Sequence, residues 1–390
     1  MTNILIFDKI IFMKEVAIIG GGASGMTCAV LLARKGVAVT LLERGERLGR
    51  KLSATGNGQG NVTNCNMGKE FYFSDDRDKV GRLLSRFGCD DTVRFLEGIG
   101  GVFLPDGRGR VYPAGRQASA VTDLLRGEIA RLGVNVVYNA RVNRITHDKK
   151  FSLYWDGGAL GADCVILAAG GKAAPNFGTD GSGYALAEAF GHSVTPLAPV
   201  LVQLKCDPAA VCGLKGIRVD GALNVIRGDK RIYACRGDVL FTESGLSGDA
   251  TFRASSYART GDRLEVDLLP EVSEERLIKI LQAGGEERLL CVVNNGLGRA
   301  LYKRAGGNVQ TIATLIKRFP LIVTGTLGYA YAQATRGGIP LKETNEDLMS
   351  IYRQGLYFTG EILNVDGACG GYNLQWAFTS AFAAYEGVLS

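Results

Sequence analysis

The residues with the clearest chemical meaning are three regularly spaced glycines, Gly20, Gly22 and Gly25. They follow an apolar, β-branched run at 15–19 that predicts a buried strand, and they precede a segment at 26–34 that predicts a helix. In this setting the first glycine allows a tight turn, the second lets the backbone approach a pyrophosphate, and the third permits close helix–strand packing. The diphosphate of a dinucleotide would then lie at a helix N-terminus, where N–H groups and the helix dipole favour negative charge.

An acidic residue completes this pattern. Residues 37–42 predict a second strand, and Glu43 follows directly, where its carboxylate would accept hydrogen bonds from the adenosine ribose. The strand–helix–strand unit has the size of one βαβ motif. Because the same fingerprint serves NAD and FAD, it predicts a dinucleotide site without choosing between them.

Three later segments favour FAD. The first, 49–58, combines cations suited to a diphosphate with a glycine loop suited to a longer, extended cofactor. The second is the turn 168–171 after a buried strand, a feature of FAD proteins of the glutathione-reductase type. The third is a strand at 356–359 that ends in Gly360 and Glu361, with Asp366 beyond it, near the expected ribityl chain and diphosphate.

A final helix is predicted to open at 371–374 and run to Tyr385. Its first N–H groups would face the pyrimidine edge of a flavin and stabilise negative charge on the reduced ring. The predicted cofactor-binding residues are Gly20, Gly22, Ala23, Ser24, Gly25, Glu43, Arg44, Lys51, Gly56, Asn57, Gly58, Val142, Ala169, Gly170, Gly360, Glu361, Asp366, Asn373 and Leu374.

The elements that must position these residues predict a nucleotide-binding α/β domain with an insertion. From about residue 195 the pattern changes to short alternating segments that suggest a β-rich domain, followed by helical patterns at 273–283, 287–294 and 311–319. The expected domains are 1–194 and 345–390 for FAD binding, with 195–344 inserted as a substrate domain. Residues 1–12 are expected to be a loose extension.

Composition narrows the class of protein. A chain of 390 residues exceeds the size of one hydrophobic core. The net charge is +6, but Lys and Arg are scattered without a block of like charges. This distribution favours a solvated surface with some preference for anionic ligands over a nucleic-acid platform.

Cysteine and histidine usage excludes several kinds of site. The nine cysteines are odd in number and form no C-x-x-C, and there are two histidines, which argues against a zinc site, a disulfide framework and a redox dithiol. The first dozen residues do not have the pattern of a signal peptide, and no apolar run approaches the ~18 residues of a membrane span. We therefore expect a cytoplasmic protein without membrane insertion or a metal.

Six segments resemble one known family, the HI0933-like (BaiN-type) NAD(P)/FAD-dependent oxidoreductases. These segments are VAIIGGGASGM (16–26), LGRKLSATGNGQGNVTN (48–64), VYPAGRQASAV (111–121), LFTESGLSGDA (240–250), TGTLGYAYAQATRGGI (324–339) and GLYFTGEILNVDGACGGYNLQWAF (355–378). The resemblance covers most of the chain and implies a Rossmann-type FAD-binding domain with an inserted β-barrel-like part and a small helical part. The family includes a reductase of ring double bonds in 3-oxo bile-acid intermediates and an aminoacetone oxidase.

For an enone or dienone substrate, the resemblance implies hydride transfer from flavin N5 to the β-carbon. A donor must stabilise the 3-oxo oxygen, and an acid must protonate the neighbouring carbon. Tyr372, Tyr331 and Arg336 are weak candidates for these roles, and Glu243 is a more distant one. Side chains of these types more often pack or pair structurally, so no catalytic residue is assigned.

Two departures limit what the family implies. The chain has Gln59-Gly60 where relatives often have Arg-Cys, which puts contacts of that loop with the flavin in doubt. It has Glu243 where they often have His, so no role of that histidine is carried over.

Several functions remain open beside the preferred one. The preferred interpretation is a reductase of C=C bonds in a steroid-like, apolar small molecule, with NAD(P)H as electron donor and no nucleic-acid partner. The glycine-rich segment 178–183 follows no predicted strand and is interpreted as a turn, so a separate NAD(P)H domain is not expected. The alternatives are an amine oxidase that releases hydrogen peroxide, a tRNA-modifying flavoprotein, and a non-catalytic flavin-binding module.

Overall fold

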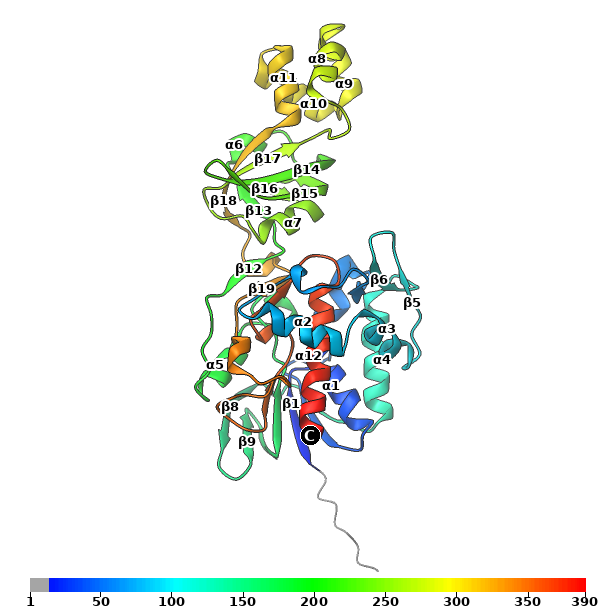
Figure 1. The fold of residues 1–390 in the computed structure, drawn as a ribbon, viewed down its shortest axis with the longest axis vertical. Helices are drawn as coiled ribbons and strands as arrows, with labels where there is room; N and C mark the ends of the chain where they lie inside the picture. Colours follow the sequence, from blue (N-terminus) through cyan, green and yellow to red (C-terminus); the bar gives the residue numbers. More distant parts are fainter. Residues whose placement is uncertain (1–13) are drawn as a thin grey trace, which may run out of the picture. The chain divides into compact units, whose positions relative to one another are not determined.

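The computed structural model describes residues 14–390, which form two compact units (Figure 1). Unit 1 contains 14–171, 177–196 and 337–390, and unit 2 contains 172–176 and 197–336. The predicted extension, 1–12, lies outside the described residues.

The end of the insertion differs from the expected position, because residues 337–344 belong to unit 1. Ile339 forms a β-bridge with Leu363, and the buried Lys79 Nζ donates to the Leu341 carbonyl at 2.9 Å. These contacts attach the segment to the FAD-binding part of the chain, although no sequence pattern marks the boundary.

A five-stranded parallel sheet forms the centre of unit 1, in the order β20-β11-β1-β2-β7. Central β1 pairs with β2 on one side and with β11 on the other. Helices cover parallel sheets, so such strands consist of continuous apolar runs, as in β1 and β11. The strands are β1 (Glu15–Ile19), β2 (Ala38–Leu42), β7 (Asn135–Val137), β11 (Cys164–Leu167) and β20 (Leu356–Phe358).

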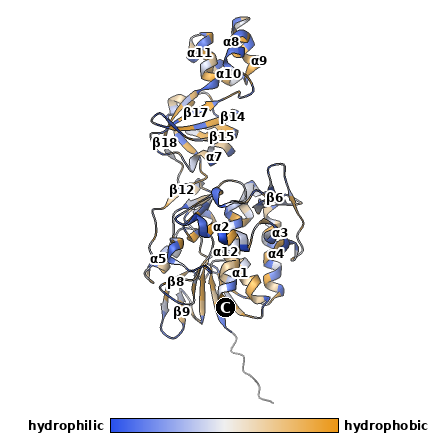
Figure 2. Cartoon of the chain, in the orientation of Figure 1, coloured by the Kyte–Doolittle hydropathy of each residue, from blue (hydrophilic) through white to orange (hydrophobic). Residues whose placement is uncertain are grey.

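Helix α1 and the C-terminal helix α12 lie side by side in unit 1 (Figure 1). Their buried side chains, among them Met26, Val30 and Phe378, belong to the same hydrophobic core as the sheet, and apolar residues run along α1 in Figure 2. Helix α1 begins earlier than the predicted residue 26, directly after the glycine turn. The helices of unit 1 are α1 (Ala23–Ala33), α2 (Arg77–Arg86), α3 (Cys89–Glu97), α4 (Ala118–Arg131), α5 (Ser182–Glu188) and α12 (Tyr372–Leu389).

Three small antiparallel sheets complete unit 1. They connect segments far apart in the sequence; β4, for example, pairs with β21 close to the start of α12. Their strands are β3 (Thr63–Asn64), β5 (Phe103–Pro105), β6 (Arg110–Pro113), β4 (Tyr72–Ser74), β21 (Val365–Gly367), β8 (Val142–His147), β9 (Phe151–Trp155) and β10 (Gly158–Ala162).

Unit 2 is built on a closed antiparallel barrel of six strands, in the order β13-β16-β15-β14-β17-β18. Alternating burial along β18 places every second side chain inside, as a barrel wall requires. The first of the short alternating segments after residue 195 forms two strands: β12, which pairs with β19, and the barrel strand β13. The strands are β12 (Ala198–Val200), β13 (Leu204–Cys206), β14 (Arg218–Arg227), β15 (Lys230–Phe241), β16 (Gly245–Ser247), β17 (Arg263–Asp267), β18 (Phe319–Thr326) and β19 (Ala334–Arg336).

Four helices gather at one end of the barrel (Figure 1). Leu277, Leu297 and Ile316 from these helices share one hydrophobic core with the barrel strands, so the helices extend the barrel core. The helices of unit 2 are α6 (Pro208–Val211), α7 (Asp249–Ser255), α8 (Glu274–Gln282), α9 (Gly285–Val292), α10 (Asn295–Ala305) and α11 (Val309–Lys317). The chain thus has an α/β Rossmann-like FAD-binding fold with an inserted six-stranded antiparallel barrel.

Within residues 14–390, no helix has the length and apolar character needed to cross a membrane. In the same range, no three His, Cys, Asp or Glu side chains are grouped as a metal ion requires.

Candidate cofactor site

The glycine turn after β1 brings β1, α1 and β11 together. Gly20 has a φ of +107°, and a Cβ there would lie 2.4 Å from the Ala168 carbonyl oxygen, so only glycine fits. Gly25 lies against the carbonyl of Gly20, which brings the first turn of α1 close to the strand. Gly22 is the N-cap of α1, has no side-chain cap, and faces space that no heavy atom fills within 4 Å. These uncapped N–H groups and the open space in front of them fit a diphosphate.

Glu43 fixes the shape of this turn. Its Oε2 accepts a hydrogen bond from the Gly21 N–H at 2.8 Å, and its Oε1 accepts one from the Gly45 N–H at 2.7 Å. A carboxylate can accept further hydrogen bonds, so Glu43 can still receive ribose hydroxyls. Its backbone carbonyl accepts from the Ala140 N–H at 2.9 Å, which places the predicted contact Val142 close by along the chain.

Two of the predicted cofactor-binding residues, Lys51 from the segment 49–58 and Arg44, are cations paired with carboxylates. Lys51 Nζ lies 2.7 Å from Glu361 Oε2, and Arg44 Nη1 lies 2.7 Å from Asp180 Oδ1. Burial would raise the pKa of Asp180, but hydrogen bonds from Arg44 and Ser182 outweigh it and lower the pKa. Because the charges of Lys51 and Arg44 are neutralised by these carboxylates, a diphosphate would depend less on these two side chains than on the backbone N–H groups of α1.

The loop predicted to contact a longer cofactor is a kinked 3-10 segment, η1 (Leu52–Gly58). Gly56, Asn57 and Gly58 all have left-handed backbones, with φ of 59°, 53° and 81°. This conformation turns the chain sharply ahead of Asn61, whose Oδ1 is buried and accepts no hydrogen bond from the described residues. Such an acceptor requires an N–H donor, and the pyrimidine ring of a flavin carries one.

The other predicted glycines converge on the first turn of α1. A Cβ on Gly360 would lie 2.7 Å from Ser24 Oγ, so the segment after β20 contacts this turn, next to Ala23. Ala169 lies against Gly20, and the Gly178–Gly183 loop contacts Ala169 and Gly170. The structure thus brings together segments that are up to several hundred residues apart in the sequence.

The start of α12 forms the other end of the site. Its N-cap is Gly371, which has a φ of +101° and no side-chain cap. A Cβ on Gly371 would lie 2.4 Å from the Thr63 carbonyl oxygen and 2.8 Å from Asn61 Oδ1. Asn373 closes a ring with Gly367, donating to its carbonyl and accepting from its N–H at 2.9 Å each, which holds the buried Asp366 near the helix start and Leu374. The uncapped helix start and the unpaired Asn61 acceptor fit the polar edge of a flavin.

Of the catalytic candidates, Tyr372 lies in unit 1 and is already engaged. Its hydroxyl donates to the Asn66 carbonyl at 3.0 Å, and its ring stacks on Phe71 at a centroid distance of 4.7 Å. Burial raises the pKa of Tyr372 to about 12. This environment favours a packing role over proton donation.

The remaining candidates lie in unit 2. Tyr331 is 60% exposed, and Arg336 Nη1 donates to the Ser256 carbonyl at 2.6 Å. Glu243 forms an exposed ion pair with Lys215 at 2.9 Å. Tyr331 and Glu243 are exposed, and Arg336 is already bound to a backbone carbonyl, so the structure assigns none of the three as a catalytic acid.

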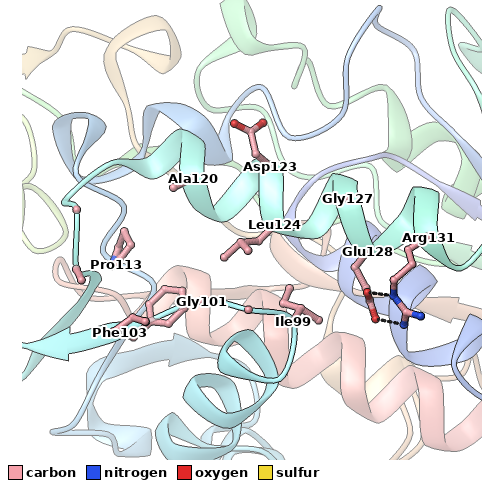
Figure 3. A pocket seen from close by; sticks show the side chains of 14 residues that line it. Ile99, Gly101, Phe103, Pro113, Ala120, Asp123, Leu124, Gly127, Glu128 and Arg131 are labelled. Carbon is pink, nitrogen blue, oxygen red and sulfur yellow. Dashed lines mark hydrogen bonds and ion pairs between the residues drawn. The ribbon is translucent and has the colours of Figure 1, made fainter.

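A surface hollow lies elsewhere on unit 1, between α4 and the loop 99–103 (Figure 3). It contains no predicted cofactor residue, and two of its three charged residues, Glu128 and Arg131, pair with each other at 2.7 Å. The hollow is therefore separate from the cofactor site.

Two residues at the cofactor site were not predicted from the sequence. Asp180 lies in the segment interpreted as a plain turn, yet it pairs with Arg44 and also with Arg141 at 3.1 Å. Asn61 follows the glycine loop and carries the unpaired buried oxygen. The only signal in the sequence was the density of glycines around each of them. Such glycines indicate that the backbone lies close to another group, but they do not identify the polar contact.

Comparison with known proteins places this geometry in a family. The model of the HI0933-like protein Rossmann domain matches residues 14–387. A 3-dehydro-bile acid delta(4,6)-reductase of Clostridium scindens is 33% identical, over 95% of this chain and 98% of the relative. A ribosomal RNA dihydrouridine synthase of Haemophilus influenzae is 29% identical, over 95% of this chain and 97% of the relative.

Among solved structures, a 3-ketosteroid-delta4-(5alpha)-dehydrogenase of Rhodococcus jostii superposes with a TM-score of 0.55, at 16% identity and 97% coverage of both chains. At this identity the likeness concerns the fold alone. The resemblance stated from the sequence is confirmed by the family match: the chain belongs to the HI0933-like family and is a flavin-dependent oxidoreductase of that family.

Proposed function

We propose that this chain uses FAD to reduce a C=C bond conjugated to a carbonyl group, in a 3-oxo-4-ene or 3-oxo-4,6-diene bile acid or a related steroid-like molecule. The observation that carries the proposal is the likeness to the 3-dehydro-bile acid delta(4,6)-reductase, which extends over almost the full length of both chains. When bound, FAD supplies the hydride for such a reduction.

The chain's own groups would bind the cofactor and polarise the flavin ring. The backbone at Gly22 and the start of α1 would hold the diphosphate, and Glu43 would hold the ribose. The 18-residue helix α12 would direct the positive end of its dipole at the polar edge of the flavin ring. Partial positive charge there favours the electron-rich form of the ring, which supports a reduction of substrate.

The reaction class is common to both kinds of relative. A 3-oxo-4,6-diene has its double bonds conjugated with a ring carbonyl. Uridine and dihydrouridine differ by one double bond, which is also conjugated with a ring carbonyl. In both cases hydride addition at the β-carbon places negative charge on the carbonyl oxygen, and the neighbouring carbon takes a proton. We therefore assign the type of bond more firmly than the molecule that carries it.

A uridine in ribosomal RNA is a second candidate substrate, and the charge distribution favours it. Unit 2 carries 20 Lys and Arg against 14 Asp and Glu, whereas the rest of the chain carries 25 of each. The entire net charge of +6 therefore belongs to the inserted unit, although it looks scattered along the sequence. A unit with this net positive charge suits a polyanionic partner. The charge distribution therefore disagrees with the expectation that the protein has no nucleic-acid partner.

A parallel reaction with two candidate substrates under anaerobic conditions tests these proposals. The purified protein is loaded with FAD, reduced with NADH or NADPH, and mixed in parallel with a 3-oxo-4,6-diene bile acid and with ribosomal RNA lacking dihydrouridine. Return of the oxidised flavin spectrum with a saturated steroid in the mass spectrum supports the first proposal. Return with a uridine heavier by two hydrogen atoms supports the second.

Two other results would contradict both proposals. Peroxide formation from aminoacetone in air, without reduction of either substrate, would identify an amine oxidase. A flavin that no donor reduces and no substrate reoxidises would identify a binding module. Flavin reduction by NADH or NADPH alone would establish only the electron donor, which we also propose to be NAD(P)H.

A further inference from the structure

The surface hollow of unit 1 lies between two apolar edges (Figure 3). One edge is helix α4, which contributes Leu124 and Gly127 to the lining. The other edge is the loop 99–103, where Val102 is 63% exposed, and Leu104 in β5 is 55% exposed two residues further on. Large apolar side chains exposed beside an apolar hollow are typical of a surface that another protein covers.

Gly127 has no internal reason to be a glycine. It lies within α4 in the ordinary helical conformation, where glycine destabilises a helix relative to alanine. Outside the backbone of the helix itself, no heavy atom of residues 14–390 lies within 4 Å of the position that a Cβ on Gly127 would take. The missing side chain therefore leaves the backbone of α4 open to close approach by a body outside this chain.

The charges on this face of α4 are complementary to themselves. Asp123 and Arg131 lie four residues before and four residues after Gly127, about one helical turn to each side. Their side chains are 66% and 65% exposed. If two copies of α4 cross in antiparallel orientation at Gly127, the two-fold axis places Asp123 of each copy opposite Arg131 of the other. A second copy of this chain therefore offers a charge match on both sides of the crossing point.

Both charged side chains can change partner at little cost. Arg131 pairs with Glu128 at 2.7 Å, but Glu128 also pairs with Arg34 at 2.7 Å and would keep this cation. Asp123 pairs with Arg126 at 3.0 Å, and Arg126 also donates to a backbone carbonyl. Exposed ion pairs contribute little to stability, so neither pair within the chain prevents a new pair with a second copy.

We propose that the chain forms a symmetric dimer through this face, with α4 of one copy crossing α4 of the second copy at Gly127. The second copy would also cover the hollow and its exposed side chains Val102 and Leu104. All these residues belong to unit 1, and none is a predicted cofactor residue. The proposal therefore does not depend on which substrate the enzyme reduces.

Sedimentation velocity of the FAD-loaded full chain, over a range of concentrations, tests the proposal first. We expect a species with twice the mass of one chain that dissociates on dilution. A monomer at every concentration up to about 100 μM, where even a weak dimer is populated, would overturn the proposal and leave the hollow to a different partner.

Exchange of the two charges tests the orientation. Asp123→Arg places two arginines opposite each other on both sides of the crossing point, and Arg131→Asp places two aspartates there. Each variant alone should raise the dissociation constant of the dimer at least about tenfold. An equal mixture of the two variants restores an arginine–aspartate pair on both sides, so it should form a mixed dimer. Absence of this mixed dimer from two variants that still bind FAD would contradict the proposed contact.

Gly127→Gln tests the close approach without risk to the fold, because glutamine favours a helix interior over glycine. The melting temperature of the diluted monomer should stay the same or rise, while the dissociation constant of the dimer rises at least about tenfold. The matched control exchanges two exposed charges of α8 in unit 2, as Glu275→Arg combined with Lys279→Asp, and should leave the dimer unchanged. A dimer that Gly127→Gln leaves intact would show that the copies meet elsewhere.

Discussion

At Glu43, one carboxylate accepts hydrogen bonds from the Gly21 N–H of the glycine turn and from the Gly45 N–H in the loop after β2. Hydrogen bonds to a charged acceptor contribute about 1.5–3 kcal/mol each. In Glu43→Gln the amide nitrogen cannot accept, so one of the two bonds is lost and the ribose loses a charged partner. We expect the dissociation constant for FAD to rise at least about tenfold. Flavin fluorescence during titration of the apoprotein measures it. Glu46→Gln, an exposed neighbour, is the control, and an equal effect of both substitutions would contradict the role given to Glu43.

Tyr372 gives the opposite prediction, because its hydroxyl is used within unit 1. Removing that hydroxyl in Tyr372→Phe leaves the Asn66 carbonyl without this donor but keeps the stacking on Phe71. We expect the free energy of unfolding to fall by about 1 kcal/mol and the rate of flavin reoxidation by substrate to stay within about twofold. Denaturant unfolding and anaerobic stopped-flow spectroscopy measure the two quantities. A hundredfold slower reoxidation with unchanged stability would instead make Tyr372 the proton donor.

At the scale of elements, prediction from the sequence worked where local pattern and tertiary burial agree. Strand β1 has the predicted bounds, because a short, continuous β-branched run followed by glycines favours a buried strand. Helix α10 was missed, since Gly296 and Gly298 lower its helix propensity. Its stability comes instead from the Asn294 cap, which accepts from the Gly296 N–H at 2.9 Å, and from the burial of Leu297 and Leu301.

The cofactor site shows the same limit. Its glycines could be located from spacing, because each conformation is encoded by a single residue type. The ion pairs Lys51–Glu361 and Arg44–Asp180 could not be predicted from the sequence. In each pair the carboxylate comes from a distant segment whose position depends on the folded sheet. Lys51, which was predicted to face a diphosphate, and Arg44, which was predicted to bind the cofactor, are therefore both paired with carboxylates in the fold.

A buried histidine links three segments of unit 1. His192 Nδ1 lies 3.1 Å from Glu343 Oε2 in η5 (Leu341–Glu343), and its Nε2 lies 2.7 Å from Ser350 Oγ. Burial lowers the pKa of His192 below 6.5 and outweighs its hydrogen bond with Glu343. As the pH falls below 6.5 the unfolded state takes up the proton first, so the stability present above 6.5 is lost progressively down to the folded-state pKa.

We therefore expect the free energy of unfolding to decrease from pH 6.5 towards pH 4.5, by up to about 1.4 kcal/mol per pH unit. His192→Gln should remove this slope, while the only other histidine provides the control His147→Gln, which should keep it. Melting temperatures measured between pH 4.5 and pH 6.5 test this prediction. Glu343 affects stability in a separate pH range. Burial would raise its pKa, but hydrogen bonds from Ser193 and His192 outweigh burial and lower the pKa. The stability that Glu343 contributes is therefore lost only below pH 4.5. A slope that persists in His192→Gln would exclude His192 as its source.

At the scale of the whole molecule, the two units differ in net charge and in the site residues that they carry. Unit 1 carries the residues proposed for the cofactor and has no net charge, while unit 2 carries the whole excess of +6. The location of this charge could be counted from the sequence, because the predicted insertion, 195–344, already contains 20 Lys and Arg against 15 Asp and Glu. If the protein binds polyanions, as the second proposal requires, we expect the inserted barrel and its helices to be the part that binds them.

Charge reversal at the start of β15 tests this division. Lys230 and Arg231, the first two residues of β15, are exposed, and neither forms an ion pair within residues 14–390. Lys230→Glu combined with Arg231→Glu should make the protein elute from a heparin column at lower salt. It should also reduce the log–log salt dependence of ribosomal RNA binding by about 1–2, since each phosphate contact contributes about one. Lys35→Glu combined with Lys149→Glu changes the net charge equally but on exposed positions of unit 1, so it should have a smaller effect. Equal shifts for both pairs would mean that net charge alone governs polyanion binding. Unequal shifts together with unchanged bile-acid turnover would separate an RNA-binding role of the barrel from the reduction of a small substrate.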